Sequence, residues 1–82
     1  MSKPYFLWDY NLDDEEVKKI LRQGDEYEKR WLVARILEHA HFRDVFNYLT
    51  LEDISGIFSK LRLRPVTQRY WQRALNAWGY DV

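Results

Sequence analysis

The sequence has 82 residues and a mass of 10.1 kDa, which limits it to one domain. Hydrophobic residues make up 46% and aromatic residues 17%, so the chain carries enough large apolar side chains for a packed core. It contains no cysteine and its formal net charge is zero, which excludes disulfides and thiolate chemistry and disfavours indiscriminate binding to nucleic acid or anionic membranes.

The apolar pattern predicts one all-α domain of four to five short helices, with an N-terminal aromatic arm over residues 1–12 and a helical core over residues 13–82. Residues 4–12 show neither helical spacing nor alternation, so we expect the arm to be extended. It either folds onto the core or inserts into a partner. Trp8 and Tyr10 are therefore candidate protein-interaction residues.

The first predicted helix opens with acidic residues at 13–16, which favour the positive end of the helix dipole, and Gly24 ends it. The second helix spreads its apolar residues around more than one face, so we expect it to be the central one. Thr50 and Asp53 form a capping-box pattern before the fourth helix, and Arg64 precedes Pro65, which predicts a turn at 63–64. The helices are predicted at about residues 13–23, 25–38, 42–49, 50–61 and 65–78.

The last helix is expected to face the core with Tyr70, Trp71, Ala74, Leu75 and Trp78. Its opposite side, with the turn before it, is rich in side chains that contact bases and phosphates, and the pair of helices has a helix-turn-helix-like layout. These residues are the candidate site for nucleic acid or an acidic partner: Lys60, Arg62, Arg64, Gln68, Arg69, Gln72, Arg73 and Asn76. The alternative is an ordinary solvated surface, because arginine and glutamine are good helix formers.

Charge is unevenly distributed along the chain. Residues 1–28 contain four basic and eight acidic side chains, whereas residues 59–74 contain five basic side chains and no acidic one. The basic stretch either pairs with the acidic N-terminal half inside the fold or forms a site for phosphate or an acidic partner surface.

No catalytic or metal-binding constellation is evident, and we expect a non-enzyme without a cofactor. His39 and His41 are two positions apart and would point to opposite sides of a helix, which disfavours a metal site. The three glycines are isolated, so there is no phosphate-binding loop.

Arg35 and His41 match the loose Arg-x4-6-His pattern of small HEPN-like ribonucleases, in which the histidine would act as general base. No segment approaches the roughly 20 apolar residues of a membrane span, and we expect a cytoplasmic protein.

Four stretches, PYFLWDYNL, EKRWLVARILEHA, VFNYLTLEDI and LRPVTQRYWQRALNAWGY, resemble a family of short bacterial and archaeal proteins without a defined activity, and they cover nearly the full chain. Members of that family are associated with nucleotidyltransferase-like toxins, so the resemblance implies an antitoxin-like or accessory role. The expected function is a small non-catalytic regulatory or adaptor module that binds a protein partner, possible partners being such a toxin and DNA. A purely protein-binding or self-associating module is the first alternative, and a small ribonuclease is the second.

Overall fold

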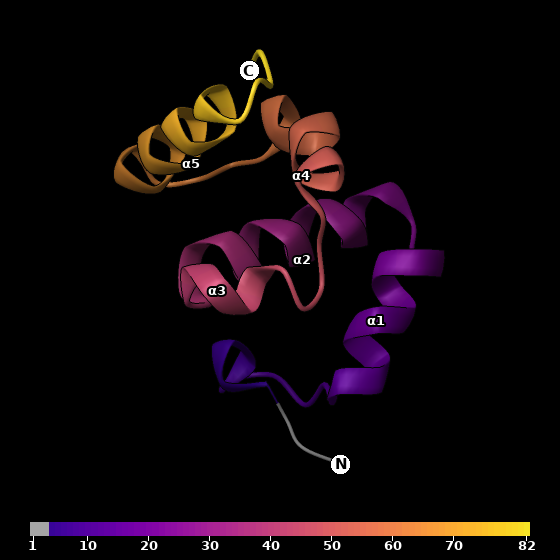
Figure 1. Cartoon of the computed structure of the whole chain (residues 1–82). Helices are drawn as coiled ribbons and strands as arrows, with labels where there is room; N and C mark the ends of the chain where they lie inside the picture. Colours follow the sequence, from indigo (N-terminus) through magenta and orange to yellow (C-terminus); the bar gives the residue numbers. More distant parts are fainter. Residues whose placement is uncertain (1–3) are drawn as a thin grey trace.

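Five α-helices and two short 3-10 helices follow one another in the computed structural model, which describes residues 4–82 (Figure 1). The first three residues of the predicted arm lie outside this range. No strand occurs in residues 4–82, so the predicted all-α single domain is confirmed. None of the described helices is long and apolar enough to cross a membrane. The elements are η1 (Tyr5–Leu7), α1 (Asp14–Gln23), α2 (Glu26–His39), α3 (Phe42–Val45), α4 (Leu51–Ile57), η2 (Phe58–Lys60) and α5 (Pro65–Ala77).

Three helices begin at capping boxes, in which the cap side chain and the residue three positions later hydrogen-bond to each other's backbone N–H. Asp13 caps α1, Asp25 caps α2 and Thr50 caps α4, the last as its pattern predicts. Gly24 ends α1 by donating its N–H to the carbonyl oxygen of Ile20 at 2.8 Å. A Cβ atom there would lie only 2.7 Å from that oxygen, so the close approach requires glycine.

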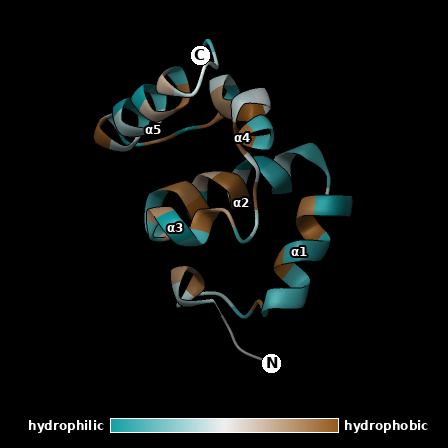
Figure 2. Cartoon of the chain, viewed as in Figure 1, coloured by the Kyte–Doolittle hydropathy of each residue, from teal (hydrophilic) through white to brown (hydrophobic). Residues whose placement is uncertain are grey.

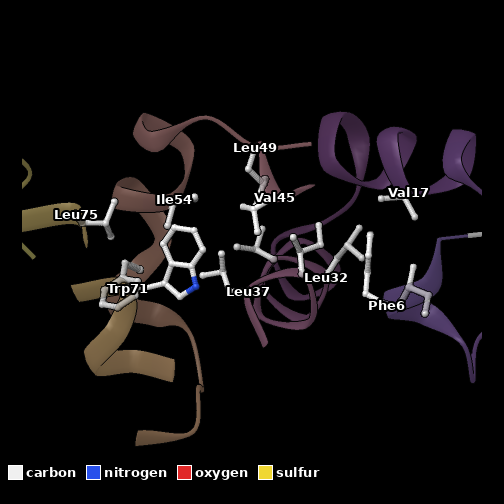
Figure 3. Close-up of a cluster of buried hydrophobic side chains, with 13 residues drawn as sticks. Phe6, Val17, Leu32, Leu37, Val45, Leu49, Ile54, Trp71 and Leu75 are labelled. Atoms are coloured by element: carbon white, nitrogen blue, oxygen red, sulfur yellow. The ribbon is translucent and has the colours of Figure 1, made fainter. Parts of the chain in front are cut away.

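Helix α2 is the centre of the core. It contributes Leu32, Val33, Ile36 and Leu37, and Figure 2 shows broad brown, hydrophobic turns along the later part of its ribbon. Figure 3 shows the buried side chains as a row that runs from Phe6 at one end to Leu75 at the other, with α2 between them. Every other element adds one or two members of this cluster, and the turn after α3 adds Leu49; the helical members are Phe6, Leu7, Val17, Val45, Ile54, Phe58, Trp71 and Leu75.

The aromatic arm differs from the extended segment expected from its sequence. Residues 5–7 form the 3-10 helix η1, which buries Phe6 and Leu7 in the core and leaves Tyr5 at the surface. An extended chain would send adjacent side chains to opposite faces, whereas one tight turn buries two neighbours together. The Tyr5 hydroxyl accepts a hydrogen bond from the His41 backbone N–H and donates one to Asp44, both at 2.7 Å. The arm is therefore folded onto the α2–α3 junction.

The third and fourth helices are shorter than their apolar spacing predicts. Helix α3 covers only Phe42–Val45, and turns carry the chain on to Leu49. Helix α4 ends at Ile57, where the chain tightens into η2, and Leu61 is already extended. Gly56 lies in the last turn of α4, where it weakens helix propensity.

The last helix follows a four-residue extended connection over residues 61–64 (Figure 1). Leu61 and Leu63 are partly buried against the core, whereas Arg62 and Arg64 are exposed, which is the alternation of an extended chain. Pro65 occupies the first position of α5. The helix-turn-helix-like arrangement expected of α4 and α5 is not seen as such in this architecture, and it stays a sequence-based prediction.

Candidate functional site

An open groove of about 670 Å³ runs along one side of α5. Its α5 lining repeats at helical spacing, with Val66, Arg69, Tyr70, Arg73, Ala74, Ala77 and Trp78, and α3 contributes Phe42. The buried stripe of the same helix consists of Trp71 and Leu75. Helix α5 is thus apolar over a wider arc than the core covers, and the uncovered part forms the groove.

The expected core face of α5 is therefore only partly correct. Trp71 and Leu75 are buried, but Tyr70 is 54% and Trp78 is 48% exposed. Helix α3 is short, and both Phe42, in its first turn, and Phe46, directly after it, remain partly exposed beside this face of α5.

Aromatic rings line this surface in fixed mutual positions. The Phe42 ring stacks on Trp71 at 5.2 Å between centroids and on Trp78 at 5.8 Å. Tyr70 meets Phe42 edge to face at 5.9 Å. Aromatic pairs of this kind stabilise a structure by about 0.5–1.5 kcal/mol beyond their burial, so the rings support one another in this arrangement. Contiguous exposed apolar surface is typical of an interaction site.

Arg69 and Arg73 are the charged residues of the groove. They are four residues apart on α5, and neither forms an ion pair within residues 4–82. No acidic residue lines the groove either. The two guanidinium groups are therefore available to an acidic group that approaches the aromatic surface.

The other predicted cations lie elsewhere. Lys60 pairs with Glu26 at 3.2 Å, and Arg62 lines a separate pocket against α2. Arg64 pairs with Glu38 at 2.7 Å through Nε and also donates its backbone N–H to the same carboxylate at 2.6 Å. The basic stretch is thus divided between α2 and the groove. Of its cations, Lys60 forms the expected ion pair with a residue of the acidic segment 1–28, namely Glu26.

Glu38 is a structural anchor of α5. Its side chain is only 11% exposed, and besides Arg64 it accepts a hydrogen bond from the Thr67 hydroxyl at 2.8 Å. Burial alone would raise the pKa of the Glu38 carboxyl, but the hydrogen bonds from Arg64 and Thr67 outweigh it and lower the pKa below its usual value. The ionised carboxylate therefore holds the start of α5 against the end of α2.

The predicted polar face of α5 is also divided. Gln72 donates a hydrogen bond to the Val82 carbonyl oxygen at 3.1 Å, and Asn76 accepts one from the Val82 backbone N–H at 3.4 Å. Gln68 is exposed. Of the predicted base-contacting residues, Gln72 and Asn76 thus hold the C-terminal segment, and Gln68 lies free on the helix surface.

Trp8 and Tyr10 are held against α2 by Arg35. The guanidinium carbon of Arg35 lies 4.5 Å from the Trp8 ring centroid and 5.3 Å from that of Tyr10. Arg35 also donates from Nε to the Phe6 carbonyl oxygen at 3.0 Å and forms an ion pair with Asp9. Both rings remain partly exposed, so a protein-interaction role for them stays a prediction.

The two residues of the ribonuclease pattern, Arg35 and His41, and the second histidine, His39, each contact the aromatic arm. Arg35 is engaged by the arm, the His41 ring lies 5.3 Å from the Tyr5 ring, and the His39 ring lies 5.1 Å from Trp8. Within residues 4–82 no three histidine or acidic side chains group as metal ligands would. These contacts account for each of the three residues structurally.

Sequence reasoning missed Phe42, Val66, Tyr70 and Trp78 as surface residues. The available signal was the number of apolar positions on α5, which exceeds what one core face needs. Comparison with known proteins adds nothing to this geometry, because no protein-family model, curated protein or solved structure matches the chain.

Proposed function

We propose that the protein is a non-catalytic adaptor module whose α3–α5 groove binds an acidic amphipathic helix of a partner protein. The observation that carries the proposal is the exposed aromatic surface of Phe42, Tyr70 and Trp78 beside two arginines that form no ion pair within residues 4–82. Apolar grooves receive the apolar face of a helix, and arginine binds carboxylates through paired hydrogen bonds.

Charge complementarity defines the occupant. Arg69 and Arg73 lie one helical turn apart and no carboxylate lines the groove, so a partner helix with acidic residues beside its apolar stripe would pair with both. Aromatic and arginine side chains are also the residues that dominate binding energy at protein interfaces. An antitoxin-like role, with the acidic helix on a nucleotidyltransferase-like partner, is one biological form of this function.

Duplex DNA fits the same surface less well. Lys60 and Arg64 are paired with carboxylates, and Gln72 and Asn76 contact Val82, so the α5 face keeps two unpaired cations. Two phosphate contacts would give a slope of only about −2 in a plot of log affinity against log salt concentration. So weak a dependence of affinity on salt is not typical of a DNA-binding domain, which contacts more phosphates.

The test is a peptide-display selection on the wild-type protein alone, after which the affinity of each enriched peptide is measured for the wild type and for the double variant R69E/R73E. We expect the enriched peptides to combine carboxylates with apolar anchors at helical spacing, and to lose at least about tenfold in affinity for Trp78→Ala or for R69Q/R73Q. Gln68→Ala, on the same helix but outside the groove, is the matched control.

Three results would overturn the proposal. The first is enrichment of peptides without acidic residues, and the second is enrichment of peptides that bind R69E/R73E as well as the wild type. The third is duplex DNA that binds more tightly than any selected peptide and loses affinity steeply between 50 and 200 mM salt, which is the behaviour of a protein with many phosphate contacts.

A further inference from the structure

A second pocket lies between α2 and residues 60–62. Tyr27, Arg30, Trp31 and Ala34 form one face of α2 at i, i+3, i+4 and i+7, and Lys60 and Arg62 complete the lining. Its volume is about 510 Å³, within the usual size of small-molecule sites. None of these residues lines the α3–α5 groove.

The pocket lies between two ion pairs that join α2 to residues 60–64. Basic side chains occur at every second position of this segment, and acidic ones face two of them from α2. Lys60 meets Glu26 and Arg64 meets Glu38, but Arg62, between them, shares its pocket with Arg30 and with no acidic residue. Two arginines therefore line this pocket, whereas the basic residues on either side of Arg62 are each paired with a carboxylate of α2.

The Arg30 side chain also has a polar atom without a hydrogen-bond partner in residues 4–82. Its Nε is buried and has no hydrogen-bond partner within the described residues. Buried polar atoms are almost always hydrogen-bonded, and an unpaired donor on a charged group is costly. Glu26, the nearby carboxylate, is already engaged by Lys60. An anion with several acceptor oxygens in this pocket would place a negative charge beside Arg30 and reduce its repulsion with Arg62.

Two aromatic rings indicate what the anion is attached to. Tyr27 is 78% exposed, and Trp31 makes an edge-to-face contact with Tyr10 at 4.8 Å between centroids. Rings of this kind stack on flat heterocycles. We propose that this pocket binds a small phosphate monoester that carries a flat ring, with the phosphate between Arg30 and Arg62 and the ring against Tyr27 and Trp31.

The experiment titrates the full chain with adenosine monophosphate, inorganic phosphate and adenosine, and follows the Arg30 Nε–H and Trp31 indole N–H signals by ¹⁵N–¹H correlation spectra. We expect adenosine monophosphate to shift both signals saturably and to bind more tightly than either of its parts. Arg62→Gln should weaken its binding at least about tenfold. Tyr27→Ala should weaken it at least about fivefold and leave inorganic phosphate unaffected.

Arg69→Gln is the matched control, because it removes an exposed arginine from the other surface with the same change in net charge. Arg62 and Tyr27 are exposed, and circular dichroism checks that their variants remain folded. No saturable shift with adenosine monophosphate overturns the proposal. Equal weakening of adenosine monophosphate binding by Arg62→Gln and Arg69→Gln also overturns it, because that result would report overall charge. Equal affinity for adenosine monophosphate and inorganic phosphate overturns it as well. Peptide binding at the groove is measured separately, so either site can fail alone.

Discussion

Replacing Glu38 by alanine tests whether one carboxylate docks α5 onto the rest of the fold. The substitution removes three hydrogen bonds, from the Arg64 backbone N–H, the Arg64 guanidinium and the Thr67 hydroxyl. The backbone and hydroxyl bonds are worth about 1–1.5 kcal/mol each to a buried carboxylate. The guanidinium bond adds at most about 1 kcal/mol, because the Arg64 side chain is 65% exposed.

Two smaller effects oppose this loss. Alanine has the higher helix propensity, and Glu38 places a negative charge in the last turn of α2, where the helix dipole disfavours it, so together they return a few tenths of a kcal/mol. The free energy of unfolding should therefore fall by about 2–3 kcal/mol. For a domain of this size the melting temperature should fall by roughly 8–24 °C.

The effect should depend on pH. The folded-state pKa of Glu38 lies below its value in the unfolded chain, so its contribution is present above the unfolded pKa of about 4.3 and is lost as pH falls through the folded pKa. Urea unfolding of the wild type and Glu38→Ala should differ by a constant amount near neutral pH and converge in acid.

Glu26→Ala is the comparison, because it breaks the ion pair with Lys60, in which both side chains are more than half exposed, and should leave stability nearly unchanged. Thr67→Val isolates the hydroxyl bond and should show a part of the loss. A stability change below about 0.5 kcal/mol for Glu38→Ala, or one independent of pH, would refute the account of α5 docking.

Three further substitutions probe other parts of the fold. Arg35→Met should cost about 2–3 kcal/mol, because it removes the hydrogen bond to Phe6 and the contact with the Trp8 ring, and hydrogen exchange in residues 5–10 should rise; unchanged exchange would contradict this. Phe6→Ala should cost about 3–5 kcal/mol in chemical denaturation, because the ring is 1% exposed, and a loss below about 1 kcal/mol would show that the arm is not part of the core. Gly56→Ala should stabilise the protein by about 0.5–1 kcal/mol, because nothing lies within 4 Å of the new Cβ; a lower melting temperature would argue against a helical backbone there.

The helices were largely predictable because their signals are local. Capping residues such as Thr50, the glycine at 24 and the proline at 65 act within one turn of the chain, and the structure places helix boundaries at them. The apolar pattern of α2 likewise predicted its central position. The shortness of α3 was not predictable, since its apolar spacing continues beyond the point where the helix ends.

The candidate sites depended on contacts between distant residues. The sequence has Lys60, Arg62, Arg64, Arg69 and Arg73 in one basic stretch. In the structure the end of η2 and the extended residues 61–64 bring the first three beside α2, and α5 leaves the last two beside the groove. Which cations are neutralised is decided by Glu26 and Glu38, more than 25 residues away in the chain.

Local chemistry thus settled the all-α class, the helix starts and the absence of thiol chemistry, because propensity, capping and composition act through neighbouring residues. Tertiary packing decided which aromatic residues stay exposed, because that depends on how much surface one helix offers another. It also decided that Arg30 and Arg62 line one pocket whose lining includes no acidic residue. Charge pairing and burial are properties of positions in space, and the periodicity of a single helix does not specify them.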